Sequence, residues 1–385
     1  MAPESDQAPP HLVHGMGTDL EAPSWPMITG HEAHEVLAAF PQAGRLEGLG
    51  WHSPRPFSAA TLVATSSGDL FLKRHHRSVR DVEGLAAEHA FIAHLAARGM
   101  PVVEVLQTGA GATALTLGEW TWEVHRKADG LDLYRERQSW TPWLTDGHAR
   151  AGGAALARLH RAAQDFAAPA RSAQSLLASL TILTCADPLA GAERYIRARP
   201  ALADYLADKD WRATLARLFA VFEVDRLAPA LAAEAAIWTH NDWHPSNLLW
   251  TPDGGVATVL DFGLSDRTCA LHDLATALER SAVRWLELGG LELGGDAAIG
   301  DPVAARALLA GYCAVRPLTA PERDLLVRLV PVVHLEFALS EIAYFHGVVG
   351  RRDYADLAWH DYLIGHAEWF LTASGRALLA EVGSL

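Results

Sequence analysis

The sequence predicts an α+β protein with a bilobal fold, in which a small antiparallel-sheet lobe precedes a larger, mostly helical lobe. The chain has 385 residues, half of them hydrophobic, which is enough for a sizeable core. Strand and turn signals dominate from Leu49 to His125. After about Lys127, Ala- and Leu-rich segments with helical periodicity take over. Together these three observations predict the fold class.

The same shifts in composition predict the boundaries of the lobes. Residues 1–28 contain several prolines and no sustained periodicity, which predicts a flexible N-terminal tail. Residues 29–125 form the predicted N-lobe, and residues 126–385 form the predicted helical C-lobe. Ligands favour the cleft between two such lobes.

Each element follows from local periodicity and turn residues. In the N-lobe the predicted elements are a short helix at 29–40, a strand hairpin at 61–65 and 70–74, a helix at 79–98, and a second hairpin at 113–117 and 120–125. In the C-lobe the predicted helices are 144–164, 172–183, 201–220, 302–315, 320–347 and 353–381, with a strand-turn-strand at 248–260.

Charge and composition exclude several classes of function. The net charge of −14 and the pI near 5.7 disfavour a broad electrostatic interaction with nucleic acid or anionic lipid. No apolar run reaches the length of a membrane span, and three scattered cysteines suit a reducing cytosol. The sequence therefore predicts a cytoplasmic protein without nucleic-acid or membrane partners, and leaves its oligomeric state open.

The most informative segment is the pattern H-x-D-x-x-x-x-N, which ends at Asn247. Asp261 opens an Asp-Phe-Gly tripeptide fourteen residues later, after the predicted strand pair. Phosphoryl transfer needs a carboxylate to accept the proton of the attacking hydroxyl, and Asp242 is the candidate base. It also needs oxygen ligands for Mg²⁺, which Asn247 and Asp261 would supply. Each residue alone could be an ordinary turn residue, but their order and spacing together favour catalysis.

The few lysines of the chain give independent evidence for a phosphate-binding site. Of 32 basic residues only Lys73, Lys127 and Lys209 are lysines. Lys73 ends a predicted apolar strand, where a kinase places its phosphate-binding lysine. Glu88 lies on the apolar face of the next helix, where a carboxylate is costly unless paired. We therefore expect a Lys73–Glu88 pair, the alternative being a surface lysine and a glutamate at the rim of the helix.

With these motifs in place, residues 30–345 resemble the aminoglycoside phosphotransferase and choline kinase family of protein-kinase-like small-molecule kinases, which includes homoserine kinases. Further similar stretches are residues 155–160 with Ala162 and Ala163, 273–275, Gly311 with Tyr312, and 317–319. The resemblance implies a protein-kinase-like fold, an N-lobe that binds the nucleotide, and a C-lobe with the catalytic loop and acceptor site.

The resemblance also implies individual roles. Glu123, Val124 and His125 would form the hinge that meets adenine through backbone groups, and Asp273 would brace the catalytic loop. We interpret His240 as a packed, hydrogen-bonded anchor of that loop rather than a proton carrier.

Two departures from the family pattern bear on the ligands. Residues 51–60 lack a G-x-G-x-x-G, so Ser58, Arg55 or backbone amides must hold the donor phosphates in another way. ATP is the expected donor, with GTP left open. Asp273 follows Asp261 by only twelve residues and no Ala-Pro-Glu element follows, which favours a small hydroxyl acceptor over a peptide.

Residues that touch the acceptor are harder to predict. Trp243 follows the candidate base and could stack on a sugar ring, or pack in the core. A polar stripe on the last part of the predicted 320–347 helix could line an acceptor pocket, where acids would suit an amine, or form a solvated or helix-pairing face. The acceptor candidates are Trp243, Asp266, Arg267, His334, Glu336, Glu341 and Tyr344.

The sequence thus favours an ATP- and Mg²⁺-dependent phosphotransferase acting on a hydroxyl of a sugar, amino sugar, aminocyclitol (including an aminoglycoside) or amino alcohol. One alternative is a nucleotide-binding pseudokinase or scaffold. Another is a metallohydrolase that uses His240, Asp242 and His244, although this would leave Lys73 and the Asp-Phe-Gly tripeptide unexplained.

Overall fold

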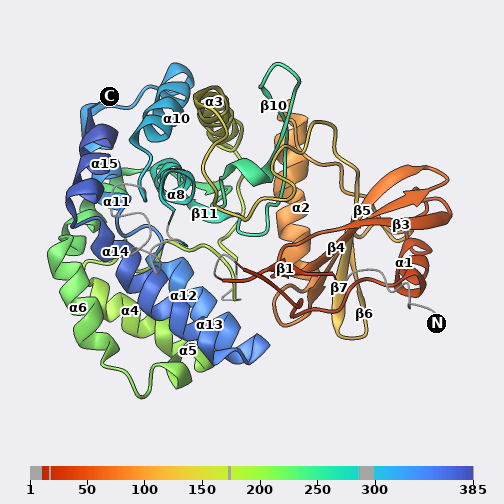
Figure 1. Ribbon diagram of the computed structural model, residues 1–385, viewed down its shortest axis with the longest axis horizontal. Coiled ribbons are helices and arrows are strands. Elements are labelled where there is room, and N and C mark those ends of the chain that lie inside the picture. The colour runs from red at the N-terminus through yellow and green to blue at the C-terminus, as the bar shows by residue number, and fades with distance from the viewer. Residues whose placement is uncertain (1–10, 17–18, 172–174, 285, 287–298, 385) are drawn as a thin grey trace, which may run out of the picture.

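The computed structural model describes residues 11–16, 19–171, 175–284, 286 and 299–384. A small sheet lies at one side of the molecule and most helices lie at the other, with helix α2 (Val82–Ala97) between them (Figure 1). The mixed α/β architecture with a small antiparallel sheet is the one the sequence predicts.

The sheet of the N-lobe is antiparallel with strand order β3-β4-β5-β7-β6. Its strands are β3 (Leu46–His52), β4 (Ala59–Thr65), β5 (Gly68–His76), β6 (Ala114–Leu117) and β7 (Trp120–Arg126). Both predicted hairpins are present. Lys73 on β5 pairs in register with Glu123 on β7, which brings two charged residues of distant sequence to one face of the sheet.

Two helices accompany this sheet, both in predicted positions. Helix α1 (Gly30–Leu37) begins with a capping box between Thr29 and Glu32, which satisfies backbone N–H groups that the first turn leaves free. Asp81 caps α2 in a similar way, and the buried face of α2 includes Leu85, Phe91, Ile92 and Leu95.

The N-terminal segment differs from the predicted loose tail. Residues 1–10 and 17–18 lie outside the described residues, but β1 (Val13–His14) and β2 (Leu20–Glu21) pair with each other. Met16 and Ile28 are buried, and Trp25 donates its indole N–H to the Tyr344 hydroxyl at 2.9 Å. Apolar and aromatic anchors that show no periodicity therefore fix this segment across both lobes.

The C-lobe is mostly helical. Its helices are α3 (Asp146–Ala162), α4 (Pro188–Arg197), α5 (Pro200–Tyr205), α6 (Trp211–Val221), α7 (Leu227–Ala233), α8 (Ala270–Ala282), α10 (Pro302–Val315), α11 (Ala320–Leu329), α12 (Leu335–Tyr344), α13 (Arg352–Leu357), α14 (His366–Trp369) and α15 (Ala373–Gly383). Short π-helical turns at Phe345–Val349 and Ala358–Gly365 follow α12 and α13.

Two short strand pairs interrupt these helices. The predicted strand-turn-strand is present as β9 (Leu248–Trp250) and β10 (Val256–Val259). The second pair, β8 (Ala236–Thr239) with β11 (Asp266–Cys269), and the fully buried helix α8 that follows it have no counterpart among the predicted elements.

Other predicted helices differ in extent. Of the predicted helix 172–183, residues 172–174 lie outside the described residues and 175–183 are not helical. The predicted 320–347 helix is interrupted after α11, where Pro331 lacks the backbone N–H that a helix needs. The 201–220 and 353–381 predictions are each divided into shorter helices.

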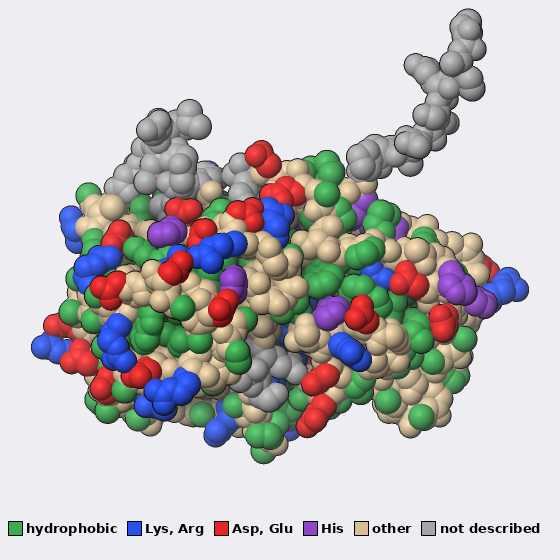
Figure 2. Space-filling view, turned by 90° about the horizontal axis from the view of Figure 1, so that it is seen from below, with side chains coloured by type: hydrophobic (Ala, Val, Ile, Leu, Met, Phe, Trp, Pro, Cys, Tyr) green, Lys and Arg blue, Asp and Glu red, His purple; other side chains and the backbone are tan. Residues whose placement is uncertain are grey.

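The surface carries both signs of charge. Basic and acidic side chains are interspersed over the face shown in Figure 2, without a large patch of one sign. None of the helices in the described part of the chain has the length and hydropathy required to cross a bilayer.

Candidate active site

The loop after β8 is held by a buried carboxylate. Asp273, at the start of α8, accepts hydrogen bonds from the backbone N–H groups of His240 (2.9 Å) and Asn241 (2.8 Å). His160 contributes a third contact, at 3.0 Å from its Nε2 to Asp273. Burial alone would raise the pKa of Asp273, but the bond from His160 lowers it, so the brace is ionised. This arrangement fixes the backbone that presents Asp242.

Several side chains surround the Asp242 carboxylate. Asn247 donates its amide N–H to Asp242 at 3.0 Å, and the indole N–H of Trp140 approaches it at 3.3 Å. Nε2 of His244 lies 3.4 Å away, and the buried guanidinium of Arg280 forms an ion pair with the same carboxylate. The carboxylate is therefore oriented from several sides while it still lines a cavity.

The β9–β10 hairpin brings Asn247 and Asp261 to the same place. The backbone oxygen of Asn247 accepts the N–H of Leu260, the residue before Asp261, at 2.8 Å. The amide nitrogen of Asn247 is engaged with Asp242, which leaves its side-chain oxygen available. An amide oxygen and a carboxylate are hard ligands of the kind Mg²⁺ prefers, so the donor set fits this ion.

Lys73 and Glu88 do not form the direct pair that the sequence predicts. Nζ of Lys73 instead lies 3.1 Å from Asp261 Oδ1. Burial alone would lower the pKa of Lys73, but Asp261, Glu123 and Glu88 together raise it. Burial alone would raise the pKa of Asp261, and the Lys73 ammonium instead lowers it to about 2. Both groups are therefore charged at neutral pH.

Glu88 pairs with Arg171 at 3.4 Å, a partner that the sequence did not suggest. The same guanidinium donates to the backbone oxygens of Gly84, Gly263 and Ser265. Arg171 thus connects α2 to the segment after Asp261, and the charge of Glu88 is compensated there.

Glu123 is the centre of a buried cluster. Its carboxylate contacts the Nε2 atoms of His75 (2.9 Å), His89 (2.8 Å) and His125 (2.9 Å). Burial would raise the pKa of Glu123, but His125 and the other two histidines hold it well below its usual value. An ionised Glu123 beside Lys73 therefore helps to compensate the ammonium.

The predicted hinge is only partly open to a nucleotide. The backbone oxygen of Val124 already accepts the N–H of Leu106 at 2.8 Å, and the Val124 side chain is buried in the core of the sheet. His125 and Glu123 do line a cavity, which continues along Lys127 and Ala128.

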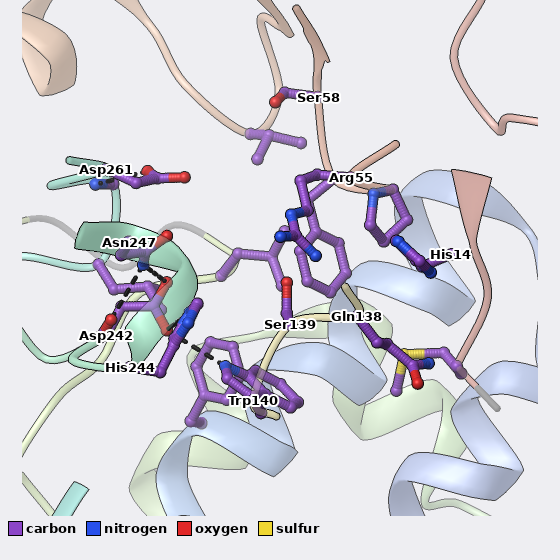
Figure 3. Close-up of a pocket in the computed structure, with 18 of the residues that line it drawn as sticks. His14, Arg55, Ser58, Gln138, Ser139, Trp140, Asp242, His244, Asn247 and Asp261 are labelled. Carbon is purple, nitrogen blue, oxygen red and sulfur yellow. Dashed lines mark hydrogen bonds and ion pairs between the residues drawn. The ribbon is translucent and has the colours of Figure 1, made fainter. Parts of the chain in front are cut away.

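Two adjoining cavities meet at these residues. The first encloses about 980 Å³, including its open mouth, and the second about 1200 Å³. Both are lined by Arg55, Ser58, Lys73, Asn247 and Asp261. Only the first is lined by Asp242, and Figure 3 shows Asp242, His244 and Asn247 together on one wall of it. Only the second is lined by Glu88, Glu123 and His125.

The acceptor residues suggested by the sequence lie outside both cavities. Trp243, Asp266, His334, Glu336, Glu341 and Tyr344 are buried, and Arg267 is exposed on β11. Glu336, for example, accepts hydrogen bonds from the backbone and side chain of Thr181 and from the N–H of Ile182. The polar stripe of α12 faces inward and Glu336 anchors a neighbouring segment, so neither Glu336 nor Glu341 lines a cavity where it could meet an amine.

The residues of the alternative metallohydrolase interpretation, His240, Asp242 and His244, are not arranged as a metal site. His240 donates from Nε2 to the Leu260 oxygen (2.9 Å) and accepts the Asp242 N–H at Nδ1 (3.2 Å), so both ring nitrogens are engaged. Nδ1 of His244 bonds Ser246 at 2.9 Å. These contacts fit the interpretation of His240 as a hydrogen-bonded anchor of the loop.

Strained backbone is concentrated around the site. Trp140, Leu176, Asn241 and Asp261 adopt positive φ angles of 50–60°, which are costly for residues other than glycine. Three of them line the first cavity, and Asn241 precedes Asp242. The surrounding contacts must therefore over-determine these conformations.

The sequence did not suggest Arg171 or Arg280 as site residues. Arg280 follows Asp273 by seven residues on α8 and therefore shares its helix face, which is a signal that could have been used. Arg171 carries no comparable signal because its partners come from two segments that are far from it in sequence.

A small antiparallel sheet, a helical lobe and the Lys73, Asp242, Asn247 and Asp261 side chains between them define a kinase-like phosphotransferase that acts on small molecules. The family model of the phosphotransferase enzyme family matches residues 53–321, and the chain belongs to this family.

Similar proteins agree with this assignment. A homoserine kinase of Caulobacter sp. (strain K31) is 27% identical over 287 residues, which cover 73% of this chain and 76% of that protein. Among solved structures, a microcompartment-associated aminopropanol kinase is similar with a TM-score of 0.58 and 17% identity, covering 92% of this chain and 99% of the other. An aminoglycoside phosphotransferase from Alicyclobacillus acidocaldarius has a TM-score of 0.52 and 18% identity, covering 94% and 98%.

Proposed function

We propose that the protein transfers the γ-phosphoryl group of ATP to a hydroxyl of a small molecule, with Asp242 as the catalytic base. The observation that carries this proposal is the meeting of Asp242, Asn247, Asp261 and Lys73 around one cavity. These are the side-chain types that phosphoryl transfer requires, and they come from both lobes.

Each of these four side chains has one role in the proposed phosphoryl transfer. Asp242 accepts the proton of the acceptor hydroxyl, whose oxygen bonds to the γ-phosphorus. The bond from that phosphorus to the bridging oxygen breaks, and ADP leaves. Asn247 and Asp261 would hold Mg²⁺, which when bound supplies positive charge to the donor phosphates. Lys73 is charged and directed toward Asp261, where it can approach the same phosphates.

We assign one substrate to each of the two cavities. We assign the second cavity, between β5, β7 and the β9–β10 hairpin, to the nucleotide, and name it the nucleotide cavity. The first, beside Asp242, is the acceptor cavity. Ser58 borders both, and its position between β3 and β4 suits a donor-phosphate contact. We propose ATP as donor, with a nucleotide-binding lobe at 29–125 and an acceptor-binding lobe at 126–385.

We propose that the acceptor is a small hydroxyl compound: a sugar, amino sugar, aminocyclitol or amino alcohol. The names of similar proteins, a homoserine kinase and an aminopropanol kinase, support a small hydroxyl compound as the acceptor. Asp273 follows Asp261 by only twelve residues, and this short segment disfavours a peptide.

The test is ADP release over a panel of these compounds, with ATP or GTP as donor and product mass confirming one added phosphoryl group. We expect at least one acceptor to be phosphorylated, ATP to be preferred over GTP, and EDTA to abolish turnover. Nucleotide binding without transfer to any member of the panel, or turnover that persists in EDTA, would contradict the proposal and favour a nucleotide-binding scaffold.

A further inference from the structure

The charges that line the acceptor cavity are unbalanced. Among the described residues its only carboxylates are Asp242 and Asp261, and each already pairs with a cation, Arg280 and Lys73 respectively. Arg55 and Arg80 also line the cavity, and neither has a carboxylate within ion-pair distance in the described part of the chain. Three cations and two carboxylates of the described residues therefore line the cavity, and Asp132 and Glu136, which act on Arg55 from outside the lining, offset this excess in part.

The two guanidinium groups differ in what they can still bind. Arg80 donates through both terminal nitrogens to the backbone oxygens of Val79, Ser175, Leu176 and Gly263, so it contributes charge but few free donors. Arg55 makes one side-chain hydrogen bond, from Nη1 to the Arg137 oxygen at 2.7 Å. Its other donors remain for a ligand, and Figure 3 shows the side chain in the middle of the cavity, between Asp242 and His14.

The neighbouring histidines do not change this balance. Burial, and then the nearby Arg55 charge, lower the pKa of His14, and the same two causes lower that of His244 to about 3. Both rings are therefore neutral at neutral pH. Burial lowers the pKa of Arg55 itself to about 10, so the guanidinium stays charged.

The described lining also offers an ammonium group no unpaired carboxylate. The acids that the sequence offered for an amine, Glu336 and Glu341, are buried elsewhere. Phe57 and Phe337 supply apolar contact on the lining instead. A cation in this cavity would meet Arg55 and Arg80, and the described lining holds no carboxylate other than the paired Asp242 and Asp261 to compensate it.

We propose that the acceptor carries an anionic oxygen group, a carboxylate or a phosphate, and that Arg55 binds it in the acceptor cavity. A guanidinium presents its N–H groups as a planar fork that matches such an anion. This inference rests on the proposed phosphotransferase function and assigns its acceptor class. The competing source of the same chemistry is the donor phosphate chain, because Arg55 also borders the nucleotide cavity.

Acceptors that differ only in their terminal group test the proposal. One set is hydroxybutanoate, butanediol and aminobutanol, and a second is gluconate, sorbitol and glucamine. Binding is measured by calorimetry with the enzyme saturated by Mg²⁺ and AMP-PNP, and turnover by ADP release with ATP. We expect the carboxylate of each set to bind at least about tenfold more tightly than the neutral member, and the amine to bind most weakly.

Variants of Arg55 identify the residue responsible. We expect Arg55→Gln to lose that preference, with carboxylate affinity falling about tenfold and diol affinity unchanged, Arg55→Lys to keep part of it, and Arg55→Glu to favour the amine. Arg45→Gln is the control, because Arg45 is an exposed N-lobe arginine that lies outside both cavities. It should leave the order of acceptors unchanged.

The outcomes separate the two proposals. Equal binding of all three members, tighter binding of the amine, or no binding of any anionic member would overturn the inference about the acceptor. So would an Arg55→Gln enzyme in which only the KM for ATP rises, since Arg55 would then serve the donor. A carboxylate preference without any turnover would instead keep this inference and contradict the phosphotransferase. Turnover of neutral or cationic acceptors alone would keep the phosphotransferase proposal and contradict the anionic acceptor.

Discussion

The orientation of the Asp242 carboxylate depends on a cation that lies outside the acceptor cavity. Arg280 lies on the buried helix α8, stacked at 4.8 Å from the Trp140 ring and 4.5 Å from the Phe337 ring. Its guanidinium pairs with the Asp242 carboxylate but does not line the acceptor cavity. Arg280 is therefore a positioning residue, which holds the proposed base without touching either substrate.

Removing this cation should affect turnover more than binding. We expect Arg280→Met to lower kcat by about 10- to 100-fold, because the carboxylate loses a buried partner, while the KM for ATP changes little. Arg280→Lys should restore part of kcat. Steady-state kinetics on both variants, with Arg306→Lys on the exposed surface as control, checks this. A normal kcat in a well-folded Arg280→Met enzyme would refute the positioning role.

The second prediction at this scale concerns Lys73. A planar guanidinium is not equivalent to the compact ammonium that contacts Asp261 at 3.1 Å. We expect Lys73→Arg to weaken nucleotide affinity and to lower turnover by at least about tenfold. Calorimetric titration with ATP and initial rates test both effects. Lys209→Arg is the matched control, because Lys209 lies outside both cavities, and wild-type behaviour of Lys73→Arg would show that the lysine has no special role.

Motif spacing predicted which residues meet, but not all of their partners. Asp242, Asn247 and Asp261 lie around one cavity because a short loop and a hairpin fix their relative positions, and Lys73 on β5 joins them through its contact with Asp261. The partner of Glu88 depends on tertiary packing: Arg171 reaches it from 83 residues away. The acceptor candidates on α12 failed to reach the cavity for a similar reason, since helical periodicity shows which residues share a face but not what that face contacts.

At the scale of elements, tertiary hydrogen bonds explain the predicted helix that does not form. In segment 175–183, Arg80 donates hydrogen bonds to the carbonyl oxygens of Ser175 and Leu176. Glu336 accepts hydrogen bonds from the N–H groups of Thr181 and Ile182. These groups would otherwise bond within a helix. Side-chain partners from distant segments therefore override a local preference that the sequence shows correctly.

Helices α3 and α10 approach each other through glycine. A Cβ atom at Gly311 would lie 1.9 Å from the Arg150 carbonyl oxygen, and one at Gly153 would lie 2.0 Å from that of Leu308. Backbone atoms cannot move aside as a flexible side chain can. The close approach is therefore available only to glycine at both positions.

Alanine at either position should force the helices apart. We expect Gly153→Ala and Gly311→Ala each to reduce the free energy of unfolding by about 1–3 kcal/mol. Gly30→Ala is the control, because a Cβ there meets nothing within 4 Å and Gly30 begins a helix. Chemical denaturation measures the three variants. Unchanged stability of both α3 and α10 variants would show that the helices do not pack as described.

For the whole molecule, stability should depend on two buried acids next to Arg280. Burial raises the pKa of Glu279 and of Glu341 to about 8, from an ordinary value of 4.5. Between these values the folded protein keeps protons that the unfolded chain has released. Their contribution to stability is therefore fully present below pH 4.5 and declines as the pH rises, until it is lost above about pH 8.

Removing one of these acids should flatten that dependence. We expect Glu341→Gln to unfold at a higher temperature than the wild type near pH 8, with a smaller difference near pH 5, because glutamine never has to lose a proton. Thermal melts across this range test the difference, with the exposed Glu47→Gln as control. A difference that grows toward low pH would give the wrong sign for a raised pKa.

The central claim is that Asp242 performs chemistry rather than binding. The most direct measurement is turnover and nucleotide affinity of Asp242→Asn beside Asp253→Asn, a control in the exposed β9–β10 turn. We predict that Asp242→Asn binds ATP with Mg²⁺ like the wild type but loses about 10²-fold or more in kcat, while Asp253→Asn retains full activity. Near-normal turnover by Asp242→Asn would contradict the account.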